Sequence, residues 1–256
     1  MKRKLLFTLF IFFSFLTSLA ADYSHIKVLE VIDCDTVRLE NGNLLRYIGL
    51  DTPEVRIKKG EEFIFSPQPF SQEATEFNRK LVEGKFVRVE FDVEKKDQYG
   101  RLLGYCFVGD VFVNAKLLEE GYAVLYTRPT NIKYADLFVR LQSLAREAKK
   151  GLWGSYETID QSKAYKFIGQ IRTVRGRVLN TGKSAKCIFL NFGENWKSDF
   201  TVAIFNNSLS AFYKKGIDPL TFYQGRIVEA TGRIREYNGP EIVINNPDEL
   251  TLIDEK

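Results

Sequence analysis

The stretch "VIDCDTVRLENGNLLRYIGLDTPEV", residues 31–55, decides the fold of the first half of the chain. It contains short runs in which apolar and polar residues alternate, separated by a turn at Asn41-Gly42. An Asn-Gly pair flanked by such alternation is the strongest short-range signal of a β-hairpin. Carboxylates gather near the strand ends. They are Asp33 and Asp35 before the hairpin and Asp51 and Glu54 after it, with Arg46 between them.

These residue types predict chemistry on a phosphate. Asp35 and Asp51 are short carboxylates at strand ends, where they can converge on a hard cation such as calcium, which prefers oxygen ligands. Glu54 is longer and can reach a water as a general base. Arg46 and Arg101 suit the negative charge that develops on a phosphate in the transition state. Taken singly, each residue has an ordinary structural explanation, because Asp near a turn hydrogen-bonds local backbone.

Composition narrows the possible chemistry. The 256 residues include one histidine, His25, and three cysteines, with no C-x-x-C pair. A His-rich metal site is excluded, and a catalytic histidine is not expected. An odd number of cysteines leaves at least one thiol unpaired. Chemistry must therefore rest on carboxylates, arginines and a metal that prefers oxygen.

Residues 1–20 have the pattern of a secretory signal peptide. A basic start, Lys2-Arg3-Lys4, precedes an apolar run, and small residues favour cleavage after Ala20. The alternative is an uncleaved anchor, although the apolar run is short for a membrane span. We therefore expect a secreted or periplasmic protein without a stable membrane span. Cleavage would lower the formal net charge from +4 to +1, so nucleic-acid binding must rest on local clusters.

The remaining pattern predicts a mainly β protein with helices, in two domains. Residues 21–154 are expected to form a five-stranded OB-type barrel with three helices, over about 71–84, 114–121 and 134–150, and a polar loop over 56–70. Residues 155–166 are polar and unpatterned and are interpreted as a linker. Residues 167–256 hold five strand-like runs with Gly-rich turns and one helical patch, which predicts a second small OB-like β-barrel.

Five motifs of the first domain occur together in one order and spacing. The first domain closely resembles the staphylococcal (thermostable) nuclease family in its motifs "DCDTVRL", "RYIGLDTPE", "QEATEF", "DQYGRLLGY" and "VNAKLLEEGYA". The resemblance covers roughly residues 26–153. It implies a calcium-dependent phosphodiesterase that hydrolyses DNA and RNA and leaves 3′-phosphate ends. The joint occurrence of these motifs is highly specific.

The resemblance also implies roles for individual residues. Two carboxylates and a backbone carbonyl would bind calcium, a glutamate would be the general base, two arginines would bind the phosphate, and a tyrosine would contact the nucleotide. In this sequence the calcium ligands are Asp35, Asp51 and Thr52, the base is Glu54, the arginines are Arg46 and Arg101, and the tyrosine is Tyr99.

The sequence departs from the family at two places. Cys34 stands where the family usually has glycine, so the loop either tolerates a small side chain or, if it needs a positive φ, is strained there. A free thiol beside a metal site is also a redox liability. The segment "GYAVLYTRPTN" is shorter than its family counterpart. Tyr126 within it is either a base-stacking residue or a partly buried loop aromatic.

The second domain combines basic strands with aromatic residues, as single-strand-binding OB-folds do. We expect its face to include Arg172, Arg175, Arg177, Lys186, Arg233, Arg235 and Tyr237. The chain is thus expected to bind nucleic acid, with single strands favoured, and the sequence leaves the oligomeric state open. Two alternatives remain. The first domain could be a catalytically weak or inactive binding module, or the second could be a barrel that docks on another envelope protein.

Overall fold

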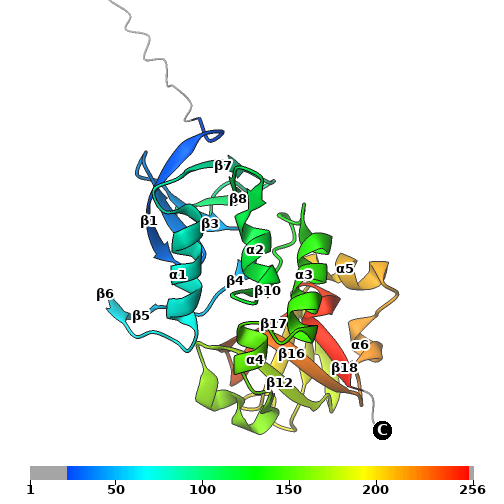
Figure 1. Ribbon diagram of the computed structural model, residues 1–256. Helices are drawn as coiled ribbons and strands as arrows, with labels where there is room; N and C mark the ends of the chain where they lie inside the picture. The colour runs from blue at the N-terminus through cyan, green and yellow to red at the C-terminus, as the bar shows by residue number, and fades with distance from the viewer. Residues whose placement is uncertain (1–21, 61, 254–256) are drawn as a thin grey trace, which may run out of the picture.

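The structure is a computed structural model that describes residues 22–60 and 62–253. The expected signal peptide lies outside the described residues. Figure 1 shows two halves, with the N-terminal strands in blue and green and the C-terminal strands in yellow to red. Among the described residues, no helix is both long and apolar enough to cross a bilayer.

The first half contains a closed five-stranded barrel, as the sequence predicted. Antiparallel pairs join its strands in the order β3-β2-β1-β7-β8, and β8 returns to pair in parallel with β3, which closes the ring. The strands are β1 (Ile26–Asp33), β2 (Thr36–Leu39), β3 (Leu44–Tyr47), β7 (Phe86–Glu90) and β8 (Leu102–Val108). The Asn41-Gly42 turn joins β2 to β3, and Gly42 has a φ of 83°, which glycine adopts without strain.

Short strands and helices complete this half. Strand β4 pairs with β10 beside the barrel, and β9 extends the sheet at β8. Their bounds are Gly49–Asp51 for β4, Val111–Phe112 for β9 and Val124–Tyr126 for β10. The three predicted helices are present as α1 (Ser71–Val82), α2 (Val113–Glu119) and α3 (Ala135–Glu147), followed by the short α4 (Leu152–Ser155). The helices pack on a core that includes Leu45, Tyr47 and Leu117.

The prediction of a polar loop over residues 56–70 is partly wrong. A hairpin of β5 (Arg56–Lys59) and β6 (Glu62–Phe65) occupies its first part and projects at the edge of the molecule in Figure 1. Charged residues within both strands, such as Arg56 and Glu62, mask this pairing in the sequence, although Gly60 adopts a φ of 65° at the turn and Ile57 pairs across from Ile64.

The second half is also a small barrel. Its long first strand is broken into β12, which pairs with β16, and β13, which pairs with β14. The ring then runs β14-β15-β17-β16, and the β15–β17 pair is parallel, like the pair that closes the first barrel. The strands are β12 (Ile171–Arg177), β13 (Asn180–Lys183), β14 (Cys187–Asn191), β15 (Thr201–Phe205), β16 (Ile227–Glu236), β17 (Pro240–Val243) and β18 (Leu250–Ile253), the last paired with β16.

Short helices accompany the second barrel. They are η2 (Asn206–Ser208), α5 (Leu209–Lys214), α6 (Pro219–Phe222) and η3 (Pro247–Glu249). The stretch interpreted as a linker, 155–166, is not without structure. It carries β11 (Ile159–Asp160), parallel to β12, and most of the 3₁₀ helix η1 (Gln161–Phe167). Asp160 accepts a hydrogen bond from the backbone of Ser162, and Ala164 is buried in the core of the second barrel.

The two barrels share an apolar seam. Val124 and Leu152 from the first half pack with Ile171 from the second, and Phe70, Trp153 and Tyr156 flank them. Hydrogen bonds run beside this cluster. Gln68 Nε2 donates to the carbonyl of Gly169 at 2.9 Å, Arg146 Nη1 donates to Thr251 Oγ1 at 2.7 Å, and Thr127 Oγ1 donates to Glu249 Oε1 at 3.1 Å. Arg146 also pairs with Glu229.

Candidate active site

Strands β2, β3 and β4 bring the first group of predicted site residues together. Asp35 lies in the tight turn before β2, and the register Thr36↔Arg46 places it next to Arg46 on β3. Gly49 then turns the chain into β4, which ends at Asp51. The turn requires glycine, because Gly49 has a φ of 87° and a Cβ there would lie 2.4 Å from the ring of Phe138.

Asp35 is fully withdrawn from solvent and is held by neighbouring donors. Its side chain is 1% exposed. Oδ1 accepts a hydrogen bond from Thr36 Oγ1 at 3.0 Å, and Oδ2 accepts one from Thr52 Oγ1 at 2.8 Å. Arg46 Nη1 forms an ion pair with the same Oδ2. These contacts fix the orientation of the carboxylate and compensate its burial.

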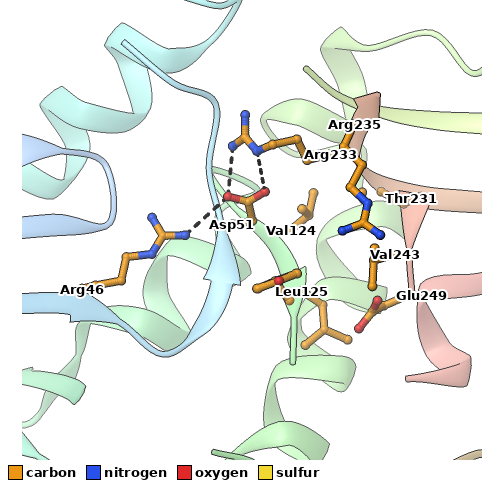
Figure 2. Close-up of a pocket in the computed structure, with 11 residues that line it drawn as sticks. Arg46, Asp51, Val124, Leu125, Thr231, Arg233, Arg235, Val243 and Glu249 are labelled. Atoms are coloured by element: carbon orange, nitrogen blue, oxygen red, sulfur yellow. Dashed lines mark hydrogen bonds and ion pairs between the residues drawn. The ribbon is translucent and has the colours of Figure 1, made fainter. Parts of the chain in front are cut away.

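Asp51 lies between two arginines from different barrels (Figure 2). Arg46 Nη2 is 3.4 Å from Oδ1, and Arg233 of β16 reaches both carboxylate oxygens at 3.0 Å. Burial alone would raise the pKa of Asp51, but Arg233 and Arg46 outweigh burial and hold the pKa below its usual value. Asp51 therefore carries its negative charge at neutral pH.

Glu54 follows β4 on a loop that Gln68 holds. The backbone N–H of Glu54 donates to Gln68 Oε1 at 3.1 Å, and the backbone N–H of Gln68 donates back to the carbonyl of Glu54 at 2.9 Å. Although 36% of the Glu54 side chain is exposed, burial of its carboxyl and the nearby Asp35, Asp33 and Asp51 raise its pKa to about 8. Arg233, whose Nη2 is 3.1 Å from Glu54 Oε1, opposes this rise.

Arg101 makes no described hydrogen bond or ion pair to Asp35, Asp51 or Glu54. Its Nε donates to Asp97 Oδ2 at 2.7 Å, within the turn that precedes β8. It nevertheless lines the same cavity as Glu54, a space of about 610 Å³ that also borders Arg233, Phe63 and Gln68. The arginine thus faces the site across open space.

The two tyrosines predicted to contact the nucleotide lie in different surroundings. Tyr99 is 76% exposed next to Arg101, whose Cζ is 5.7 Å from the centre of the tyrosine ring. Tyr126 ends β10 and lines a second cavity of about 270 Å³ together with Arg46 and Asp51. Arg233 borders both cavities and lies between them.

The acidic pair can be tested for its fit to a metal. Within residues 22–60 and 62–253, no three His, Cys, Asp or Glu side chains form a metal-holding group. The donors gathered here are two carboxylates and one backbone carbonyl, of Asp35, Asp51 and Thr52. All are oxygen donors, and Thr52 bonds to both acids, through Oγ1 to Asp35 and through its N–H to Asp51. This donor set fits a hard cation such as calcium.

Cys34 is not strained in this structure. Among the described residues, the non-glycine residues with a positive φ are Phe70, Lys149 and Asn238, and Cys34 is not one of them. The side chain is fully buried, with Sγ 3.9 Å from the carbonyl of Tyr122. Burial, reinforced by Asp35 and Asp33, raises the pKa of the thiol well above its usual value. The loop thus accommodates the side chain, and the thiol stays protonated and unreactive.

Arg233 and Gln68 are the residues of this site that sequence reasoning missed. The sequence pattern places Arg233 on a binding face of the second barrel, but in the structure its guanidinium contacts Asp51 and Glu54 of the first. Most of the other arginines expected on that face also contact rings or acidic side chains of the protein. Arg172 lies against the rings of Tyr156 and Phe167, Arg175 pairs with Glu229, and Arg235 pairs with Glu241.

Comparison with known proteins is consistent with this geometry. A family profile described as staphylococcal nuclease homologue matches residues 44–155. The thermonuclease of Staphylococcus hyicus is 37% identical over 133 residues, which are 50% of this chain and 75% of that protein. The chain belongs to the staphylococcal nuclease family. Its first barrel therefore has a nuclease fold, and the family acts on the ester bonds of nucleic acids.

Further relatives match the same half of the chain. The thermonuclease of Staphylococcus intermedius is 36% identical over 129 residues, 49% of this chain and 74% of that protein. The endonuclease YncB of Bacillus subtilis is 37% identical over 129 residues, 48% of this chain and 59% of that protein. The family profile ends at residue 155, so the second barrel, which supplies Arg233, lies beyond it.

Proposed function

We propose that the protein is an exported, calcium-dependent nuclease that hydrolyses DNA, RNA or both and leaves 3′-phosphate ends. One observation carries this proposal: Asp35, Asp51, Thr52 and Arg46 form a single bonded cluster, with Glu54 at its edge. Such a cluster of oxygen donors and a guanidinium suits a negatively charged phosphodiester and a hard cation.

Each side chain has a distinct part in the proposed reaction. Asp35, Asp51 and the carbonyl of Thr52 would hold calcium, which, when bound, supplies Lewis-acid polarisation of the phosphate. Glu54 would accept the proton of the attacking water as the general base.

The two arginines act on the phosphate itself. Arg46, anchored by Asp35, stabilises the charge that develops on the phosphate oxygens. Arg101 faces the cavity that Glu54 lines and can approach the same phosphate from the other side.

The two cavities support a single-stranded substrate. The larger is lined by Arg101, Arg56 and Phe63, and the smaller by Arg46 and Tyr126. Arginines that follow a backbone and aromatic rings that stack on bases are the usual elements of single-strand binding. In this proposal the second barrel forms one wall of the path, and Tyr99 contacts a nucleotide near its entrance.

The direct test is a cleavage assay with purified protein. Single-stranded DNA, single-stranded RNA and duplex DNA are incubated with Ca²⁺, with Mg²⁺ or with EDTA, and the products are resolved on a gel and end-mapped. We expect cleavage with Ca²⁺ only, faster on single strands, with 3′-phosphate ends. A folded protein that binds single strands but cleaves under none of these conditions would instead be a nucleic-acid-binding module.

Export is tested separately. The proposal predicts that protein recovered from outside the cytoplasm of the producing cell begins at Ala21, as determined by N-terminal sequencing. Recovery of intact residues 1–20 in a membrane fraction would support the anchor alternative.

A further inference from the structure

Arg233 links the second barrel to the acids of the first. Its Nε and Nη2 reach Oδ2 and Oδ1 of Asp51, both at 3.0 Å. Nη2 also donates to the carbonyl of Thr52 at 2.7 Å and lies 3.1 Å from Glu54 Oε1. Nη1 donates to the carbonyl of Gly169 at 2.7 Å, which anchors the guanidinium to its own barrel. The guanidinium has five N–H donors, so this arrangement nearly exhausts it.

The acceptors of Arg233 largely coincide with the donors of the proposed calcium site. Two of the three proposed ligands, Asp51 and the Thr52 carbonyl, are bound by the guanidinium. Oδ1 of Asp51 additionally accepts from the N–H of Thr52 at 3.1 Å and faces Arg46 at 3.4 Å. Both oxygens of Asp51 are therefore directed at positive groups or donors of the chain. A second cation at these oxygens would be repelled by a guanidinium that stayed in place.

A purely structural bridge between the barrels does not account for this placement. Other contacts already hold the interface together, including the apolar seam and the hydrogen bonds made by Gln68, Thr127 and Arg146. Arg235 supplies the comparison, because it lies on the same face of β16 and borders the same smaller cavity, yet it pairs with Glu241 of its own barrel. Of these two arginines of β16, Arg233 crosses to the nuclease barrel and Arg235 pairs within its own barrel.

We propose that Arg233 is a built-in competitor of the divalent cation: its guanidinium holds Asp51 and the Thr52 carbonyl, and cation binding requires it to leave. This inference rests on the proposed calcium-dependent function. The cavities of about 270 and 610 Å³ on either side of Arg233 give the side chain room to withdraw while the seam stays closed. The second barrel thereby sets the calcium concentration at which the nuclease barrel becomes active.

The competition has a measurable size. When only a fraction of the molecules is in the binding-competent state, the apparent affinity for the ligand equals the intrinsic affinity multiplied by that fraction. Charge-assisted hydrogen bonds such as those of Arg233 are strong enough to lower the fraction of molecules with a free Asp51 by roughly tenfold or more. Replacing Arg233 by a neutral, shorter side chain is therefore expected to tighten calcium binding by about tenfold to a hundredfold.

The test is calcium binding by calorimetry, with purified wild type, Arg233→Gln and Arg235→Gln. The Arg235 variant removes the same charge from the same strand without touching Asp51. We expect tighter binding for Arg233→Gln, and a change of less than about threefold for Arg235→Gln, since its charge already pairs with Glu241. Equal affinity of all three proteins, or weaker binding by Arg233→Gln, would overturn the competition while leaving the calcium assignment intact.

A second measurement needs only the wild type. In ¹H–¹⁵N spectra of the arginine side chains, the Nε signal of Arg233, assigned by triple-resonance spectroscopy of the wild type, should shift in step with calcium occupancy. The signal of Arg235 should not. Calcium binding that leaves the Arg233 signal unchanged would overturn the inference, even if Arg233→Gln proved unstable. Failure of every variant to bind calcium would overturn the proposed calcium site itself, and the competition with it.

Discussion

Thr127 of the nuclease barrel donates its hydroxyl hydrogen to Oε1 of Glu249 in the second barrel, at 3.1 Å. The other carboxylate oxygen accepts from the backbone N–H of Asn245, at 3.1 Å. Glu249 is nevertheless so deeply buried that desolvation raises its pKa to about 8, although both donors oppose the rise. A carboxyl whose neutral form is favoured at pH 7 thus lies on the interface between the barrels.

This carboxyl predicts a dependence of stability on pH. The folded pKa is about 8 and the ordinary value is 4.5, so the folded protein binds the proton more tightly than the unfolded chain. Its contribution to stability is full below pH 4.5 and is lost as the pH rises through 8. The loss is at most about 1.4 kcal/mol per pH unit. Urea unfolding between pH 5 and 8 should give a flatter profile for Glu249→Gln than for wild type. Parallel profiles would contradict the prediction.

Glu54 is predicted to act in the chemical step. Glu54→Gln keeps the shape of the side chain but cannot accept a proton, so cleavage should slow by about 10²–10⁴-fold. Single-strand binding, measured by fluorescence anisotropy, should change little. Glu62→Gln, on the neighbouring hairpin, is the matched control and should cleave like wild type. Retention of cleavage by Glu54→Gln would assign the proton transfer to another group.

Arg46 is predicted to need its planar, two-pronged guanidinium. Lysine would keep the charge but cannot reach Asp35 and Asp51 while also presenting a donor to a phosphate. We expect Arg46→Lys to lower the cleavage rate by roughly 10²–10³-fold. Single-turnover kinetics would measure the loss, and circular dichroism would check the fold. A rate within threefold of wild type would show that charge alone suffices.

Cys34 predicts a stability effect with little effect on activity. Because its backbone does not need a positive φ, glycine brings only extra freedom to the unfolded chain and a loss of buried contacts. Cys34→Gly should lower the free energy of unfolding by roughly 1–2 kcal/mol, while cleavage persists. The folded wild type should also resist thiol reagents at this position. A glycine variant more stable than wild type would mean that Cys34 is strained.

Phe63 is predicted to stack on a base of the substrate. It is 69% exposed on β6 and borders the cavity that also holds Glu54 and Arg101. Base–aromatic stacking contributes about 1–3 kcal/mol, so Phe63→Ala should raise KM for single-stranded DNA roughly fivefold or more. Val93→Ala, also exposed but not lining this cavity, is the control. An unchanged KM would remove the hairpin from the substrate path.

The nuclease barrel could be predicted from local sequence because its decisive contacts are local. Asp35, Arg46 and Asp51 are separated by a single turn or bend each, so alternation and the Asn41-Gly42 turn are enough to place them together. The β5–β6 hairpin was missed because charged residues mask its short strands.

Contacts between the barrels could not be predicted in the same way. The pairing of Arg233 with Asp51 spans 182 residues. It depends on how the two barrels dock, and neither composition nor spacing encodes that docking. Because such distant contacts are not visible in the sequence, the arginines of the second barrel are expected on a free basic face, whereas several of them contact acidic side chains or aromatic rings.

The apolar seam also affects how this protein can be divided. Val124 and Leu152 are only 2% exposed, and both belong to the family-matched half, but Ile171, which completes their buried cluster, belongs to the other barrel. A fragment cut at the end of the nuclease homology would expose this cluster to water and become prone to aggregate. The natural unit for expression, recombination or engineering is therefore the pair of barrels, because each half lacks part of its own interior.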